Sequence, residues 1–508
     1  MKRKRKARKT YCSKKVKVSS PDMDCLPDSI VLQVFSYFSQ TQLCSLALVC
    51  KRWKRLVYDG SLWRQVSLNR LKSYDIDNLL GNPIGRQLKK LFFWKCGVSP
   101  DNLVTLAEFC PQLQELYLRR NTIKEPKKQL PKAVFPELLV LDARELQGYV
   151  GHVLQIVASA QNIEMVAIDN TMDGFFDPYV FNDATHLKVL DCSRCMDIED
   201  EDIATIAFSC PNLQSLSLMR CYNIEGTSLP SLFLHCLSLK SLSISYTHVT
   251  NRVIEACALE NSCLEELDMS HCPGISSSGV YSVTSRLKDM VYININGCSF
   301  GPGIDSQVVR TLTQYASLEV LDLDVIEGQH GADEDLVTIT QRCSSTLEVL
   351  RVNKGFATAS GLKICLKNLP NLKRFGIVNY RQDYLDRGME IERVLNSLAK
   401  FNPKLEILEL SDYMDKESDK KTNAFIRLML RCKYLQKISI FTFNRDMFVM
   451  AAEARVKANR KDIRLVQPTM ICPTPRVVTT LPRMCFDRLV YGDEALYDDD
   501  PWRAKKYY

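Results

Sequence analysis

The hydrophobic residues of this chain follow two spacings, which alternate along most of its length. Stretches such as 113–118 and 213–218 read Leu-x-x-Leu-x-Leu, and their closing Leu-x-Leu alternates as a strand with one buried face does. The stretches between them, such as 197–210, place apolar residues at the three- and four-residue intervals of a helix. Each unit therefore predicts a short strand followed by a helical segment that returns the chain.

The strand pattern recurs in about fourteen copies. The best-matched copies begin at Leu113, Leu187, Leu213 and Leu264. Looser copies begin at Leu88, Leu138, Ile163, Leu239, Met290, Leu318, Leu347, Leu372, Leu405 and Leu435. One unit cannot bury its own apolar face, whereas stacked units bury a continuous core. The sequence therefore predicts an α/β solenoid over residues 68–465.

Cysteine has a structural place in this pattern. It occupies the last motif position, where the chain turns out of the strand, in five copies: Cys96, Cys195, Cys221, Cys272 and Cys298. A small side chain with a weak S–H donor suits a buried bend whose carbonyl groups need partners. The chain has 20 cysteines and opens with charged residues rather than an apolar secretory signal, so we expect free thiols in a reducing compartment.

The segment before the repeats is helical and unusually apolar. In "LPDSIVLQVFSYF", residues 26–38, one helical face carries Ile30, Val31, Val34, Phe35 and Phe38, yet further apolar residues lie off that face. A second helix is predicted after residue 39, with Leu43, Leu46, Ala47, Cys50 and Trp53 on one face. About forty residues bury too little apolar surface to be stable alone. We therefore expect this segment to dock on the solenoid and to keep apolar surface for another chain.

Residues 23–67 closely resemble an F-box. The residues that carry the resemblance are Leu26-Pro27, Ile30, Leu32, Val34-Phe35, Tyr37, Leu43, Leu46, Val49-Cys50, Lys51, Trp53, Leu56, Asp59 and Leu62-Trp63. The repeats that follow resemble the cysteine-containing subtype of leucine-rich repeats, and the combination is similar to the F-box/LRR family. The resemblance implies a non-catalytic substrate receptor of an SCF-type ubiquitin ligase. In that family the F-box binds the small adaptor subunit and, through it, cullin and RING subunits, while the repeats hold a protein substrate for ubiquitination.

The same resemblance assigns an adaptor-binding surface. By matched position, the residues that should contact the adaptor are Leu26, Pro27, Ile30, Leu32, Val34 and Phe35. Leu43, Cys50 and Trp53 should combine core and interface roles. Two alternatives stay open: a segment that only caps the open end of the solenoid, and a nuclear scaffold that uses the F-box outside a ligase.

The strand pattern also assigns a substrate-binding surface. If the apolar residues of each strand point inward, those beside and between them line the concave face of the sheet. The candidates there are Phe92, Trp94, Tyr117, Arg119, Asp142, Asp191, Glu266, Asp268, Tyr292, Asp322 and Asp324, and later copies add Arg351, Arg374 and Glu409. The first copies are aromatic and the middle copies are acidic or small, which favours a substrate with a basic segment. The alternative is that these polar side chains are merely solvated.

The sequence predicts no catalytic, metal or cofactor site. The one C-x-x-C pair, Cys192 and Cys195, lacks the second pair that a structural zinc site normally needs. The six histidines lie in scattered copies, so none is expected to activate a cysteine nucleophile. The glycine-rich phosphate-binding motifs do not occur. No run of eighteen apolar residues occurs either, so we expect no membrane span.

Both ends of the chain depart from the repeat pattern. Residues 1–22 form a basic tail in which the first eighteen residues carry ten lysines and arginines and no acid. It resembles a bipartite nuclear import signal, which favours the nucleus over the cytoplasm, and the residues concerned are Lys2, Arg3, Lys4, Arg5, Lys6, Arg8, Lys9, Lys14 and Lys15. A solvated tail, or one that contacts nucleic acid or acidic lipid, is the alternative; we expect neither nucleic acid nor membrane as a partner. Residues 466–508 contain four early prolines, which argue against a long helix.

Overall fold

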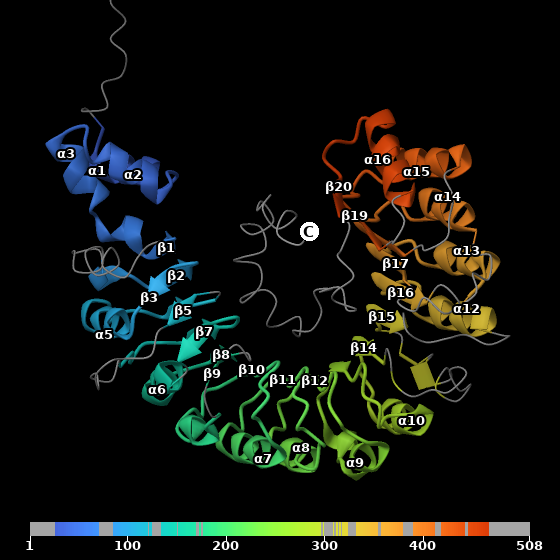
Figure 1. The fold of residues 1–508 in the computed structure, drawn as a ribbon, viewed down its shortest axis with the longest axis horizontal. Coiled ribbons are helices and arrows are strands. Elements are labelled where there is room, and N and C mark those ends of the chain that lie inside the picture. The colour runs from blue at the N-terminus through green and yellow to red at the C-terminus, as the bar shows by residue number, and fades with distance from the viewer. Residues whose placement is uncertain are drawn as a thin grey trace, which may run out of the picture.

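The chain folds into an open arc, with one long sheet on the inner side and helices on the outer side (Figure 1). The computed structural model describes residues 26–70, 85–119, 121–123, 134–149, 151–168, 172–173, 176–295, 298, 308, 311–312, 314–315, 317–323, 332–353, 357–378, 390–411, 418–441 and 446–466. The basic N-terminal residues and residues 467–508 lie outside the described part of the chain.

Among the described residues, three short helices and one 3-10 turn precede the first strand: α1 (Asp28–Phe35), α2 (Gln40–Leu46), α3 (Lys51–Val57) and η2 (Gly60–Trp63). Ser39 and Gln42 form a capping box that starts α2, and the Cys50 sulfur accepts a hydrogen bond from the Trp53 N–H at 3.4 Å and starts α3. The prediction of one helix carrying both Leu46 and Trp53 is therefore wrong. The chain turns between α2 and α3, and Cys50 is the cap of the next helix.

The main sheet contains sixteen parallel strands that follow one another in chain order. They are β1 (Gln65–Asn69), β2 (Lys90–Trp94), β4 (Glu115–Tyr117), β6 (Val140–Ala143), β8 (Met165–Ile168), β10 (Val189–Asp191), β11 (Ser215–Ser217), β12 (Ser241–Ser243), β13 (Glu266–Asp268), β14 (Tyr292–Asn294), β15 (Val320–Leu323), β16 (Val349–Asn353), β17 (Arg374–Val378), β18 (Ile407–Ser411), β19 (Lys437–Phe441) and β20 (Arg464–Val466). A second sheet joins four short strands at the turns: β3 (Gly97–Val98), β5 (Thr122–Ile123), β7 (Gln147–Tyr149) and β9 (Met172–Asp173).

Helical segments return the chain along the outer side, as the alternating pattern predicts. The α-helices are α5 (Pro100–Phe109), α6 (Gly151–Ser159), α7 (Asp200–Ser209), α8 (Leu229–His235), α9 (Asn251–Ala256), α10 (Ser277–Arg286), α12 (Ala332–Arg342), α13 (Ala359–Asn368), α14 (Ile391–Phe401), α15 (Asp419–Arg431) and α16 (Asp446–Lys457). The 3-10 segments are η3 (Gly85–Gln87), η4 (Pro178–Phe181) and η5 (Leu259–Asn261). The predicted α/β leucine-rich-repeat solenoid is confirmed.

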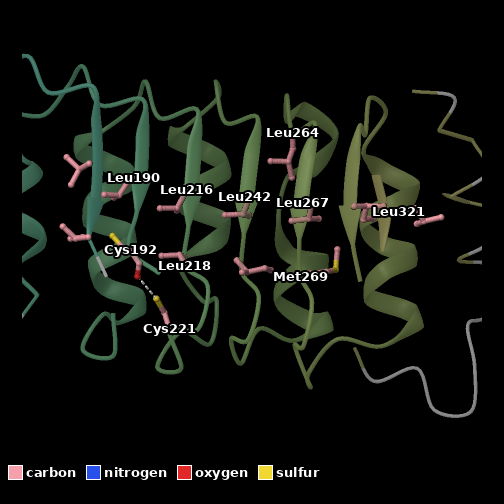
Figure 2. Packing of buried hydrophobic residues seen from close by; sticks show 14 of the residues in the cluster. Leu190, Cys192, Leu216, Leu218, Cys221, Leu242, Leu264, Leu267, Met269 and Leu321 are labelled. Carbon is pink, nitrogen blue, oxygen red and sulfur yellow. Dashed lines mark hydrogen bonds between the residues drawn. The ribbon is translucent and has the colours of Figure 1, made fainter. Parts of the chain in front are cut away.

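The core is one continuous layer between the sheet and the helices. Figure 2 shows Leu190, Leu216, Leu242 and Leu267 side by side on neighbouring strands, all buried. The turn cysteines behave as predicted: the Cys221 S–H donates to the Cys192 carbonyl at 3.1 Å, and Cys272 donates to the Ile244 carbonyl at 3.0 Å. Each thiol thus satisfies a buried carbonyl of the preceding repeat.

The sheet is longer than the pattern indicated. The fourteen predicted copies correspond to the fourteen strands of the main sheet from β2 to β19. One further strand lies at each end of this sheet, β1 and β20. The boundary expected between residues 67 and 68 therefore falls inside β1, which pairs with β2 along its whole length. Before β20 the first motif position holds Arg460 rather than an apolar residue, and before β1 it holds Trp63, which belongs to the predicted F-box.

Candidate functional site

The F-box helices are held together by a small polar cluster beside an aromatic core. The Arg52 guanidinium donates to Asp28 at 2.8 and 3.0 Å and also to the Leu26 carbonyl, which fixes α3 against the start of α1. Arg55 forms a second ion pair with Asp28. The hydrogen bond from Arg52, aided by the charge of Arg55, lowers the pKa of the Asp28 carboxyl.

The structure separates the predicted adaptor-binding residues into three groups by their exposure. Pro27, Ile30, Val34 and Cys50 are exposed, and Leu26, Leu32 and Trp53 are half-buried. The prediction for Phe35 is corrected: its side chain is 1% exposed and lies edge-on against the Trp53 ring, with 5.3 Å between the ring centroids. Leu43 is buried as well. Both belong to the core of the F-box, because α1, which carries Phe35, and α2, which carries Leu43, each pack against α3.

Three apolar side chains that the sequence did not single out for contact are the most exposed ones in the F-box. Tyr37 follows α1 and is 84% exposed, while Leu48 and Val49 lie in the turn before α3 and are 87% and 60% exposed. Turn residues belong to no helical face, so periodicity cannot assign them to core or surface. The only available sign was that this segment holds more apolar residues than one core requires.

The F-box is also docked on the first strand of the sheet. The Gln40 side-chain amide donates to the Gln65 carbonyl at 2.7 Å, and its oxygen accepts from the Ser67 N–H at 3.2 Å. The side chain thereby covers part of the open edge of β1, which would otherwise present unpaired backbone groups. The segment therefore caps the edge of the sheet and also exposes apolar side chains. A capping role does not exclude a role in binding a partner.

The strand register shows how the concave face is built. At the central position of each strand, neighbours in the sheet run Phe92, Tyr117, Asp142, Ala167, Asp191, Ser217, Ser243, Asp268, Asn294, Asp322, Arg351, Gly376, Glu409 and Ser439. The residues on either side of these positions along the strand fill the core, so the side chains described at these positions point away from the helices. Eight of the predicted positions lie in this row: Phe92, Tyr117, Asp142, Asp191, Asp268, Asp322, Arg351 and Glu409.

The first part of this row is aromatic and apolar. The rings of Phe92 and Tyr117 stack with their centroids 4.3 Å apart. Tyr117 also packs in a cluster with Val140, Met165 and Val189, which is separate from the main core. Trp94 lies two residues after Phe92 at the end of β2, and the Lys95 ammonium is 5.3 Å from the centroid of its ring.

The acidic residues of the middle part are embedded rather than solvated. The Arg144 guanidinium donates to both oxygens of Asp142, at 2.9 and 2.7 Å. Asp191 accepts from the backbone N–H of Ser193 at 3.0 Å. Burial raises the pKa of the Asp191 carboxyl, against the opposing influence of Arg144. Arg119, another predicted residue, pairs with Glu145 at 3.0 Å.

The last part of the row contains a buried ion cluster that crosses three strands. The Arg351 Nε on β16 donates to Glu409 on β18 at 2.9 Å, passing over Gly376 on the strand between them. Arg374 also donates to Glu409, at 2.5 Å. A Cβ on Gly376 would lie 3.0 Å from the Arg351 side chain, so glycine leaves the room that the crossing needs. Burial alone would raise the pKa of Glu409, but the two guanidiniums lower it.

Some predicted residues are not among those that the structure describes. Asp324 and the basic residues of the N-terminal cluster fall outside the described residues, and only the backbone of Asp322 is placed. Within the described ranges, no three His, Cys, Asp or Glu side chains are grouped to hold a metal ion. None of the helices described combines the length and apolar composition that crossing a membrane requires.

Family models match both parts of the chain. An F-box-like model matches residues 23–69, and a leucine-rich-repeat model matches residues 260–283. Human F-box/LRR-repeat protein 12 is 34% identical over 103 residues, which cover 18% of this chain and 32% of that protein. Mouse lysine-specific demethylase 2B is 36% identical over 87 residues, which cover 17% of this chain and 7% of that protein. The matched region thus spans a third or less of either relative.

Solved structures resemble the arc at low sequence identity. An internalin from Listeria monocytogenes covers 74% of this chain and 95% of its own, with 15% identity and a TM-score of 0.44. A structure of the Rad7 and Elc1 complex from yeast covers 86% and 92%, with 15% identity and a TM-score of 0.39. The chain thus combines an F-box-like segment with leucine-rich repeats, and in this it is similar to F-box/LRR-repeat proteins.

Proposed function

We propose that this chain is the substrate-recognition subunit of an SCF-type ubiquitin ligase. The F-box binds the adaptor subunit, and the concave face of the sheet holds a protein substrate. The observation that carries the proposal is the strong exposure of Tyr37, Leu48 and Val49, together with the exposure of Ile30 and Val34, in a segment whose core contains the buried Phe35 and Trp63. Exposed apolar side chains concentrated in one small unit are typical of a surface that a partner covers.

The chain needs no chemistry of its own in this role. Gln40 hydrogen-bonds the F-box to the first strand of the sheet, so the receptor places a substrate held on the concave face near the rest of the ligase. Holding two reactants together raises their effective concentration, which accelerates transfer without a catalytic side chain in the receptor. The substrate lysine and the charged conjugating enzyme are the reactants here.

The test removes the exposed apolar surface without touching the core. We expect Leu48→Asp combined with Val49→Asp to weaken adaptor binding at least about thirtyfold, since losing a central anchor costs about 2 kcal/mol or more. The measurement is co-purification of adaptor and cullin with the full chain, followed by ubiquitin transfer to captured proteins. Phe35→Ala is unsuitable because it would disrupt the F-box core.

A matched control carries the same charge change elsewhere. Phe208 on α7 and Leu234 on α8 are also strongly exposed, so Phe208→Asp with Leu234→Asp should leave the adaptor bound. Unchanged adaptor recovery with the F-box variant would refute the proposal. Recovery of adaptor without cullin from the unaltered chain would instead favour a scaffold outside a ligase.

We further propose nuclear import through the basic cluster at residues 2–15. A fluorescent fusion that lacks residues 2–17 should lose its concentration in nuclei, whereas a fusion that lacks an equal length of the C-terminal tail should not. Continued nuclear concentration after removal of residues 2–17 would contradict this.

A further inference from the structure

A strip of serines crosses the middle of the concave face. Strand β11 contributes Ser215 and Ser217, and β12 with the residue two beyond it contributes Ser241, Ser243 and Ser245; we call these five residues the serine strip. Register pairing places Ser215 beside Ser241 and Ser217 beside Ser243. Leu242 and Ile244 alternate with these serines and are buried in the core, so the hydroxyls lie on the opposite, concave side.

The hydroxyl groups around this strip are engaged, with one exception. Ser241 donates to Glu266 at 2.8 Å, Ser245 bonds to Ser270 at 2.7 Å, and Ser193 bonds to Ser217 at 2.9 Å. The Ser243 side chain is 3% exposed, yet its hydroxyl oxygen has no hydrogen-bond partner within the described part of the chain. A buried hydroxyl without a partner costs about 1–3 kcal/mol, so it marks a place where a binding group is to be expected.

Carboxylates surround the unpartnered hydroxyl. Asp268 is the register neighbour of Ser243 on β13, and Glu266 is the neighbour of Ser241. Adjacent strands lie about 4.8 Å apart, so one group above Ser243 reaches both its oxygen and the Asp268 carboxylate. Asp191 lies at the same level on β10, two strands from Ser243. Burial raises the pKa of the Asp191 carboxyl, and the nearby Asp142 also raises it, whereas Arg144 and the hydrogen bonds from Ser193 lower it.

We propose that the serine strip, with Asp268, is the subsite that receives one lysine or arginine side chain of the captured protein. The inference rests on the proposed function and deepens it. The cation donates to the Ser243 hydroxyl oxygen and to the Asp268 carboxylate. The small serines leave room for the backbone of an extended segment to approach the sheet. The aromatic pair Phe92 and Tyr117, on β2 and β4, is separated from the serine strip by β6, β8 and β10 and lies outside the subsite.

The probe is a set of extended nonapeptide pools whose central residue is fixed as Arg, Lys, citrulline or Glu and whose other positions are mixed. Binding to the full chain with its adaptor is measured by fluorescence polarisation. We expect the Arg and Lys pools to bind at least about tenfold more tightly than the citrulline and Glu pools. Asp268→Asn should abolish this preference, and Ser243→Ala should reduce it about threefold.

Matched variants keep the test specific. Asp462→Asn changes an exposed carboxylate near β20, and Ser285→Ala changes an exposed serine on α10; both should preserve the preference. Thermal melting of each variant checks folding, and Ser243→Ala serves alone if Asp268→Asn does not fold. Equal binding of all pools, tighter binding of the Glu pool, no binding of any pool, or an intact preference in both subsite variants would overturn the subsite. Adaptor co-purification is measured on the same samples. Loss of the adaptor from the unaltered chain would contradict the proposed function rather than the subsite.

Discussion

At the scale of single residues, cysteine is a hydrogen-bonding building block in this protein. The turn cysteines donate to carbonyls of the preceding repeat, as Cys96 does to Leu68 at 3.3 Å. Those that close the helices are buried too, and burial raises the pKa of Cys210 to about 12 and that of Cys236 to about 11. A thiol that stays protonated is a poor nucleophile, so this environment suits structure and not reactivity.

Thiol accessibility gives a direct check. Among the described cysteines, we expect Cys44, Cys50 and Cys263 to react with iodoacetamide at neutral pH, because their side chains are exposed. The buried cysteines should react only after denaturation, because the reagent cannot reach them and their thiols stay protonated. Peptide mass spectrometry after native labelling identifies the modified sites. Under the proposed function, bound adaptor should slow the labelling of Cys50 and leave that of Cys263 unchanged. Ready labelling of Cys221 in the folded chain would contradict the packing described here.

The buried cluster around Glu409 makes a second prediction at this scale. Glu409→Gln removes the counter-charge of two buried guanidiniums, so it should lower the free energy of unfolding by about 3 kcal/mol. Glu453→Gln, at an exposed pair with Lys457, should cost less than about 0.5 kcal/mol. Urea unfolding followed by circular dichroism measures both. A cost at position 409 no larger than at position 453 would mean that the cluster contributes little.

The pH dependence of the same residue follows from its pKa. The pKa of Glu409 is lower in the folded chain than its ordinary value, so the folded state favours the ionised form. Its stabilising contribution is therefore fully present above the ordinary glutamate pKa of about 4.3 and is lost as the pH falls through the lower folded value. Between pH 5 and pH 3 the unaltered chain should lose more stability than Glu409→Gln. Parallel losses in the two proteins would contradict this sign.

At the scale of elements, the sequence pattern predicted the features that recur from repeat to repeat. The Leu-x-Leu strands, the returning helices and the concave row all follow from alternation that fourteen copies repeat. The F-box was harder, because each helix there occurs once. Phe35 satisfies the same periodicity as Ile30, yet one is buried and the other is exposed, and only the packing against Trp53 decides between them. The crossing of Arg351 over Gly376 depends on strand register, which single-strand patterns do not contain.

The contact between the F-box and the sheet can be tested through one side chain. Gln40→Leu removes two hydrogen bonds to β1, so it should weaken docking by about 1–2 kcal/mol. The Ser67 amide, which donates to Gln40, should then exchange faster with deuterium. Gln33→Leu changes an exposed glutamine on α1 and should leave Ser67 exchange unaltered. Equal exchange in both variants would show that the docking does not depend on Gln40.

At the scale of the whole molecule, the arc is close to one-dimensional. Within each sheet, every described strand pairs with the strands before and after it in that sheet, and consecutive helices pack together from α7 to α10 and from α12 to α16 (Figure 1). Stability in such an array is a sum of repeat terms and nearest-neighbour interfaces. The serine strip lies in central repeats, which are supported on both sides. A partner-binding site there is held more rigidly than one near either end would be.

The last prediction uses this dependence on position. Leu242 on β12 and Leu435 before β19 are both buried, and replacing either by alanine should remove about 3 kcal/mol of local packing. In the central repeat this weakens interfaces on both sides, so hydrogen exchange should accelerate over several repeats and the main thermal transition should shift. Near the end, where α16 and β20 are the described elements that follow, faster exchange should stay confined to residues after about 418, with the main transition little changed. If faster exchange extended equally far from positions 242 and 435, the arc would unfold as a single unit. Nearest-neighbour coupling alone does not produce that behaviour.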